Sequence, residues 1–103
     1  VEIEIRERAS KYSEHPKERY VFHQLELEIR NQSTQPIRQL KARIHWFNSH
    51  GKDLEQQTVT MIDKSQPQLL AGQMIPFSMA EKLSKLKQSS EVEGYQIILY
   101  DAE

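Results

Sequence analysis

The sequence predicts an all-β domain, and three observations lead to this prediction. Apolar and polar residues alternate with a period of two over several short segments, as in strands that bury one face. Polar turn sequences containing Asn, Ser, Pro or Gly separate these segments. The chain of 103 residues is long enough for one hydrophobic core, so we expect a single domain over residues 1–103.

The first three strands are predicted from this alternation. Residues 1–6 alternate Val1, Ile3 and Ile5 with charged residues, and residues 21–30 and 40–46 repeat the pattern. We expect the second and third of these strands to pair as an antiparallel hairpin, since the polar stretch 31–36 between them suits a reversal. The side chains predicted to form the core, including two from the last strand, are Leu25, Leu27, Ile29, Leu40, Ile44, Trp46, Ile97 and Leu99.

The remaining elements follow from turn residues. Gly51 supplies the positive φ that a tight hairpin commonly needs, so a fourth strand is expected over 55–62. Residues 75–79 favour an extended segment, but residues 78–81 match a helix capping box, which leaves a short helix over 79–88 as an alternative. A last strand around 95–100 is apolar on both faces. Six to seven short strands in a chain of this length predict an immunoglobulin-like antiparallel β-sandwich.

Composition excludes several classes of function. Lys plus Arg total 14 and Asp plus Glu total 15, so the net charge of −1 creates no overall field that attracts nucleic acid or anionic lipid. The absence of cysteine excludes disulfides, thiolate zinc sites and a thiol nucleophile. No apolar run approaches the roughly 18 residues of a membrane-spanning helix. We therefore expect no nucleic-acid partner and no transmembrane segment in this chain.

Catalytic and metal-binding patterns are weak. No serine lies in a G-x-S-x-G elbow, and no glycine-rich phosphate loop is present. The four histidines, His15, His23, His45 and His50, lack the spacing of a metal site, although His45 and His50 lie on either side of a turn near Asp53. We interpret all four as solvated histidines on turns or strand faces. The sequence therefore predicts no enzyme, no cofactor and no metal.

The predicted hairpin leads to a candidate binding surface. If the second and third strands pair, the side chains opposite the core point outward together. Such a group of exposed aromatic rings can bind a protein or stack on a sugar. The alternative is that the loop expected over 10–18, or a neighbouring strand, covers the rings as a small satellite core. The candidate binding residues are Tyr20, Phe22, His45 and Phe47.

Several motifs between residues 20 and 80 resemble the FxLYD-type β-sandwich domains. They are the hairpin sequence 31–33, the aromatic strand 44–47, the turn 48–54, and the segment 70–73 followed by Phe77. A strand and turn built from Arg43, Trp46, Phe47, Asn48 and Gly51 are also similar to those of a related family of small bacterial lipoproteins of unknown function. The resemblance implies a sandwich domain without enzymatic activity in a periplasmic or outer-membrane-associated location. It also implies that a signal peptide or lipid anchor can precede Val1 in a precursor.

The function expected from these observations is a non-enzymatic binding or assembly module of the bacterial cell envelope that binds a protein partner. Free sheet edges would also allow a second copy of the chain to associate. The alternative is a carbohydrate-binding module that uses an exposed aromatic face of the sheet.

Overall fold

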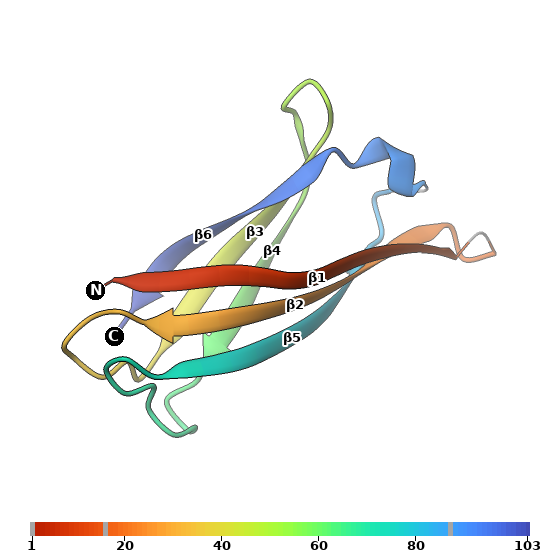
Figure 1. Cartoon of the computed structure of the whole chain (residues 1–103). Coiled ribbons are helices and arrows are strands. Elements are labelled where there is room, and N and C mark those ends of the chain that lie inside the picture. Colours follow the sequence, from red (N-terminus) through yellow and green to blue (C-terminus); the bar gives the residue numbers. More distant parts are fainter. Residues whose placement is uncertain (1, 16, 87) are drawn as a thin grey trace.

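The computed structural model describes residues 2–15, 17–86 and 88–103, and within them it contains six strands in two antiparallel sheets (Figure 1). The first sheet, in the order β1-β2-β5, consists of β1 (Ile3–His15), β2 (Tyr20–Asn31) and β5 (Met74–Leu83). The second sheet, in the order β4-β3-β6, consists of β3 (Leu40–Phe47), β4 (Asp53–Ile62) and β6 (Gly94–Ala102). A 3₁₀ turn, η1 (Ser89–Glu91), precedes β6. The predicted all-β sandwich is confirmed.

The predicted hairpin between the second and third strands is wrong. β2 pairs with β1 and β5, whereas β3 pairs with β4 and β6, so the segment between them crosses from one sheet to the other. Facing strands of a sandwich show the same inward alternation as hairpin partners, and for this reason the pattern did not distinguish the two arrangements. Because β2 and β3 lie in different sheets, the four candidate aromatic residues do not share a sheet.

Asn31 fixes the start of this crossover. Its side chain is fully buried, and its Oδ1 accepts a hydrogen bond from the backbone N–H of Ser33 at 2.9 Å. Its Nδ2 donates to the carbonyl oxygens of Gln35 at 2.8 Å and Leu69 at 3.0 Å. A side chain that bonds its own backbone two residues on is typical of a turn. Asn31 therefore ends β2 and turns the chain toward the second sheet.

The alternative of a short helix over 79–88 is also wrong. Residues up to Leu83 belong to β5, which runs antiparallel to β2 from Met74 onward. The free edge of β2 offers backbone hydrogen bonds along ten residues, and this tertiary pairing overrides the local capping signal. A turn follows at residues 84–85, and residue 87 of the predicted helix lies outside the described residues.

β1 is longer than the predicted strand over 1–6. A β-bulge in its middle interrupts the alternation from which that strand was predicted. The pairing register with β2 shifts between Glu7 and Ala9. Before the shift, odd-numbered residues of β1 lie opposite inward residues of β2, and after it even-numbered residues do, so that Tyr12 lies opposite His23. Most of the loop expected over 10–18 is therefore strand. Val1, where the prediction began, lies outside the described residues.

The core lies between the two sheets, and its predicted members on β2 and β3 are confirmed. Each of these side chains is at most 1% exposed: Leu25, Leu27, Ile29, Leu40, Ile44 and Trp46. Ile97 and Leu99 on β6 are only partly buried, because they line an open side of the sandwich. Ile37 and Leu69 form an isolated β-bridge and are both buried in the core.

The sandwich is open along two sides, and on each side an edge strand of one sheet faces an edge strand of the other. β1 lies on the side of β6, and β5 lies on the side of β4 (Figure 1). The molecule is elongated, with extents of 46 × 26 × 21 Å, and the β1–β2 hairpin projects beyond the second sheet (Figure 1). Among the described residues, no helix has the length and apolar character needed to cross a bilayer.

Candidate functional site

The four predicted binding residues form two separate pairs. Tyr20 and Phe22 lie on the outer face of the first sheet, since their neighbours Val21 and His23 are buried inside. His45 and Phe47 alternate with buried residues of β3 and lie on the outer face of the second sheet. The outer faces of a two-layer sandwich point in opposite directions. A single aromatic surface made of all four residues is therefore wrong.

The pair on the first sheet joins a small aromatic group at the β1–β2 hairpin. The ring of His15 stacks on Tyr20 with a centroid distance of 4.5 Å and meets Phe22 edge-on at 6.2 Å. Lys82 of β5 places its ammonium 4.4 Å from the centroid of the Tyr20 ring, a cation–π contact. The rings of β1 and β2 therefore contact one another, and Lys82 joins this group to β5.

The pair on the second sheet has local partners. His45 Nδ1 lies 3.1 Å from Asp53 Oδ2, and the backbone N–H of His50 donates to Asn48 Oδ1 at 3.0 Å. The Phe47 ring lies next to Gly94, where an added Cβ would come within 3.0 Å of it. In the part of the chain that the structure describes, no group of three or more His, Asp or Glu side chains is arranged to hold a metal ion.

His23 is buried in the core, and its interpretation as a solvated histidine is wrong. Its side chain is 0% exposed. The indole N–H of Trp46 donates to His23 Nδ1 at 2.9 Å, and His23 Nε2 lies 2.7 Å from Ser10 Oγ. An indole nitrogen can only donate, so Nδ1 must accept and the imidazole proton must lie on Nε2, which donates to Ser10. The structure therefore requires the neutral ring.

The surroundings of His23 favour this neutral form. Burial lowers the pKa of His23 from 6.5 to about 4, while the negative charge of Glu7 acts in the opposite direction. The ring stacks on Tyr12 at 4.1 Å between centroids and contacts Tyr95 at 5.2 Å. We call His23, Trp46, Tyr12 and Tyr95 the His23 cluster. Its members come from β1, β2, β3 and β6, so the cluster joins the two sheets.

A groove opens on the side where β1 and β6 meet. It has a volume of 710 Å³, and we call it the β1–β6 groove. Five aliphatic side chains make up most of its lining: Ile3, Ile5, Leu27, Ile97 and Leu99. β1 and β6 are both edge strands, each paired on one side only among the described residues. The groove therefore combines an apolar lining with two strand edges whose outer backbone groups are not used by either sheet.

Glu7 and Tyr95 also line this groove. The Tyr95 hydroxyl donates a hydrogen bond to the Glu7 carboxylate, which links β1 to β6. Burial raises the pKa of Tyr95, and the hydrogen bond to Glu7 and the charge of Glu7 add to this shift. Burial raises the pKa of Tyr12 to about 12, with a smaller contribution from Glu7. The negative charge of Glu7 thus reaches both the groove and the His23 cluster.

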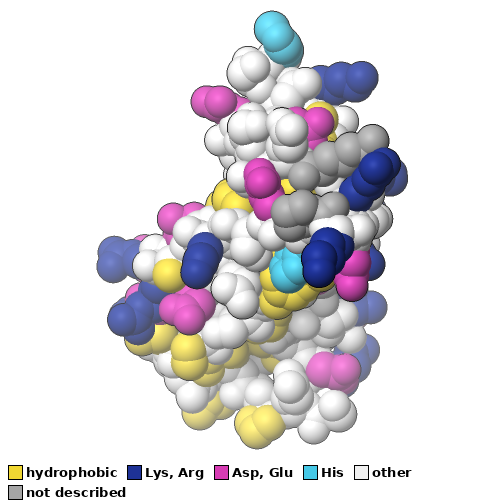
Figure 2. Space-filling model, turned by 90° about the vertical axis from the view of Figure 1, so that its right-hand side faces the viewer, with side chains coloured by type: hydrophobic (Ala, Val, Ile, Leu, Met, Phe, Trp, Pro, Cys, Tyr) yellow, Lys and Arg dark blue, Asp and Glu magenta, His cyan; other side chains and the backbone are white. Residues whose placement is uncertain are grey.

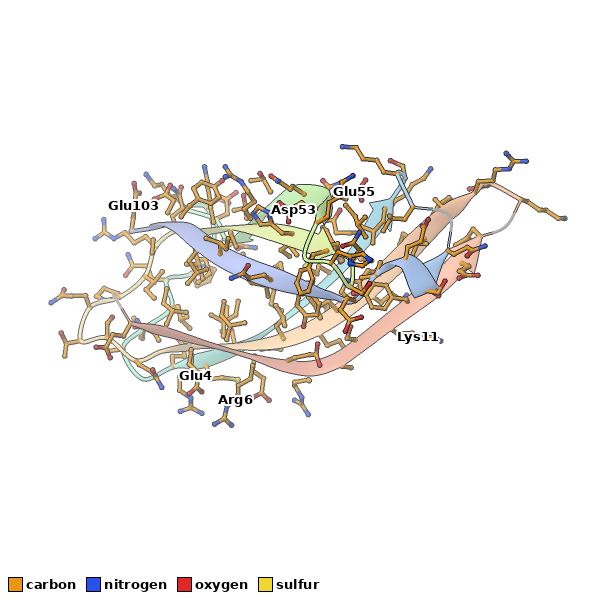
Figure 3. The ribbon with its side chains drawn as sticks, turned by 90° about the horizontal axis from the view of Figure 1, so that it is seen from above. Glu4, Arg6, Lys11, Asp53, Glu55 and Glu103 are labelled. Carbon is orange, nitrogen blue, oxygen red and sulfur yellow. The ribbon has the colours of Figure 1, made fainter. Side chains whose placement is uncertain are left out.

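The opposite open side, between β4 and β5, carries a buried carboxylate. Glu55 projects from β4 (Figure 3) and is 5% exposed. Its carboxylate accepts backbone N–H groups of Ser84 and Lys85, while its Oε2 has no hydrogen-bond partner among the described residues. Burial raises the pKa of Glu55, and burial together with the charge of Glu55 raises the pKa of Glu81 on β5. Glu55 therefore holds the turn after β5 through these backbone hydrogen bonds, but one of its buried oxygens is left without a partner among the described residues.

Charged side chains of both signs are interspersed over the end of the molecule shown in Figure 2. This mixture agrees with the nearly balanced charge of the whole chain.

The sequence prediction missed the roles of Glu7, Tyr95 and His23, although the signals for two of them were present. Glu7 continues the odd-numbered alternation of Ile3 and Ile5, so it belongs to the same face of β1. His23 continues the inward alternation of β2 between Val21 and Leu25. The meeting of β1 with β6 required the topology and had no signal in local sequence.

Comparison with known proteins informs the fold. No family model matches the chain, and no curated protein matches it. Among solved structures, the chain is similar to the crystal structure of a Bordetella pertussis protein designated ApaA, with a TM-score of 0.56 and 11% sequence identity. The likeness covers 79% of this chain and 67% of that one. At this identity, the similarity concerns the fold alone.

Proposed function

We propose that this domain is a non-enzymatic protein-binding module that accepts an extended segment of a partner protein in the β1–β6 groove. The observation that carries the proposal is the coincidence of an apolar groove with two free strand edges. An extended peptide that adds to a sheet edge gains main-chain hydrogen bonds from the edge strand. Its alternate side chains point to one side and fill an adjacent pocket.

The lining of the groove fits a peptide better than a sugar. Its aliphatic side chains offer no flat ring on which a sugar could stack, and Tyr95 is bonded to Glu7 within it. The four aromatic residues that would have formed a sugar platform lie on two opposite faces. These observations favour the protein-binding function over the carbohydrate-binding alternative.

The bacterial cell envelope is our proposed location for this function. It rests on the resemblance to FxLYD-type domains and to small lipoproteins given above, which stays a prediction. A binding module that presents a strand edge is compatible with such a location.

The test is selection of peptides from a random nonapeptide library displayed on phage, followed by NMR titration of the ¹⁵N-labelled domain with a selected synthetic peptide. We expect the amide signals of β1 and β6 to shift, and the outer amides of one edge to gain protection from hydrogen exchange. Failure to select any peptide, or shifts confined to other strands, would contradict the proposal.

Two matched variants of β6 sharpen this test. Leu99 lines the groove, whereas its neighbour Ile98 is 42% exposed and lies on the other face of the strand. We expect Leu99→Lys to weaken peptide binding by about tenfold or more, because a charge replaces an apolar contact, and Ile98→Lys to leave it unchanged. Melting temperatures of both variants verify that each is folded, and equal binding by both would contradict the proposed site.

A further inference from the structure

The groove contains one carboxylate side chain, that of Glu7, and its position follows from the alternation of β1. Ile3, Ile5 and Glu7 lie opposite Asn31, Ile29 and Leu27 of β2, so all three point toward the second sheet. All three line the groove. Glu7 follows the two isoleucines along the strand and lies where Tyr95 of β6 approaches β1. The groove therefore changes from apolar to anionic at Glu7.

The charge of Glu7 is not neutralised by the neighbouring cations. Arg6 Nε lies 3.2 Å from Glu4 Oε1, and both side chains project from the side of β1 away from β6 (Figure 3). Arg8 Nη1 lies 3.1 Å from Glu28 Oε1. Within the described ranges, Glu7 forms no ion pair, and its hydrogen-bond partner is the neutral hydroxyl of Tyr95. A carboxylate accepts several hydrogen bonds, so it retains capacity for a charged donor.

We propose that Glu7 selects a lysine or arginine in the segment that binds the groove. This inference rests on the proposed function and specifies the partner. Strands share nearly the same rise per residue, so side chains of an added strand fall opposite those of β1 at steps of two. The bound segment should therefore carry its basic residue two positions from an apolar residue that faces the isoleucines. The pattern is apolar-x-apolar-x-basic, or its reverse for the opposite strand direction.

The same phage library tests this inference with three baits. We expect peptides selected by the wild-type domain to contain the apolar-x-apolar-x-basic spacing in one direction. Glu7→Gln keeps a side chain of the same size that can still bond Tyr95, so it should select apolar residues at the same spacing without the basic preference. Glu4→Gln is the matched control, because Glu4 lies on the same strand and points away from the groove, and it should select as the wild type does.

Binding of one selected synthetic peptide gives a quantitative readout. We expect Glu7→Gln to weaken binding of the basic peptide by about tenfold. Binding of a version with norleucine in place of the basic residue should be the same for Glu7→Gln and the wild-type domain. The affinity of the wild-type domain should fall with added salt more steeply than that of Glu7→Gln, since screening weakens a charge pair. Two outcomes would overturn this inference alone. In the first, the selected peptides bind the groove but show no preference for a basic residue; in the second, Glu7→Gln selects the basic residue as the wild type does. Absence of any groove-binding peptide would overturn the proposed function as well.

Discussion

Each open side of the sandwich carries a glutamate that points toward the other sheet, but the two lie at different depths. Glu7, on the β1–β6 side, is exposed and bonded to Tyr95. Glu55, on the β4–β5 side, is almost fully buried and has one oxygen without a partner among the described residues. The exposed carboxylate stays in contact with water, whereas the buried one is desolvated.

Burial alone therefore does not decide whether a polar group stabilises this fold. His23 lies deeper than either glutamate, yet both of its nitrogens are bonded and it connects the two sheets. Glu55 is nearly as deeply buried, at 5% exposed, but one of its oxygens has no hydrogen-bond partner among the described residues. The comparison teaches that the carboxylate on the β1–β6 side is available to a partner, while the carboxylate on the β4–β5 side is already used to accept the backbone hydrogen bonds of a turn.

The largest expected effect on stability comes from Trp46 of β3, which lies in the core between the two open sides. Trp46 is 0% exposed, contacts His23 and pairs in register with Glu55. Trp46→Ala should lower the free energy of unfolding by about 3–5 kcal/mol, the usual cost of emptying a large aromatic site. Trp46→Phe should lower the free energy of unfolding by less, because an aromatic ring still fills much of the site. The remaining loss includes the hydrogen bond that the indole N–H donates to His23. Urea denaturation measures both losses, and a loss below about 1 kcal/mol for Trp46→Ala would refute the central role of this residue.

The second-largest expected effect is a loss of stability in acid, caused by His23. The pKa of His23 is lowered from 6.5 to about 4 in the folded state, so the unfolded chain takes up a proton first as the pH falls. The free energy of unfolding should therefore decrease between these two values, by about 3 kcal/mol in total from this group. Denaturation of the wild type and His23→Gln over this range isolates the effect. Curves that stay parallel would contradict it.

The smallest expected effect is a gain in stability on the β4–β5 side. Glu55→Gln keeps an oxygen for the backbone N–H groups of Ser84 and Lys85 and places an N–H donor near Glu81. We expect the free energy of unfolding to rise by about 1 kcal/mol at pH 7, because an unpartnered buried acceptor is removed.

This gain should fade with acid. The pKa of Glu55 is raised in the folded state, so the folded protein takes up that proton before the unfolded chain does, and the wild type recovers stability as the pH falls through the raised pKa. The sign is opposite to that for His23. Glu4→Gln, the same change at a half-buried glutamate of β1, serves as control. A loss of stability in Glu55→Gln would show that the charge itself holds the turn.

The inward faces of the strands could be predicted from sequence, but their partners could not. The alternation around Leu25 and Ile44 correctly predicted burial, because the period of a strand is a local property. Whether β2 meets β3 beside it or across the core depends on contacts with β5 and β6, which come much later in the chain. The bulge after Glu7 hid the second half of β1, since it exchanges the odd and even faces. Thus the predicted aromatic surface failed through wrong pairing rather than through wrong side-chain direction.

The order in which the strands pair has a consequence for the synthesis of the chain. β1 pairs with β2, and β3 with β4, so two local hairpins can form as soon as their residues leave the ribosome. β5 and β6 complete one sheet each, joining strands made much earlier, and such long loops close slowly. Translation must therefore pass Gly94 before β3, which carries Trp46, is paired along both edges. Until then, the nascent domain presents an unfinished sheet to which chaperones can bind.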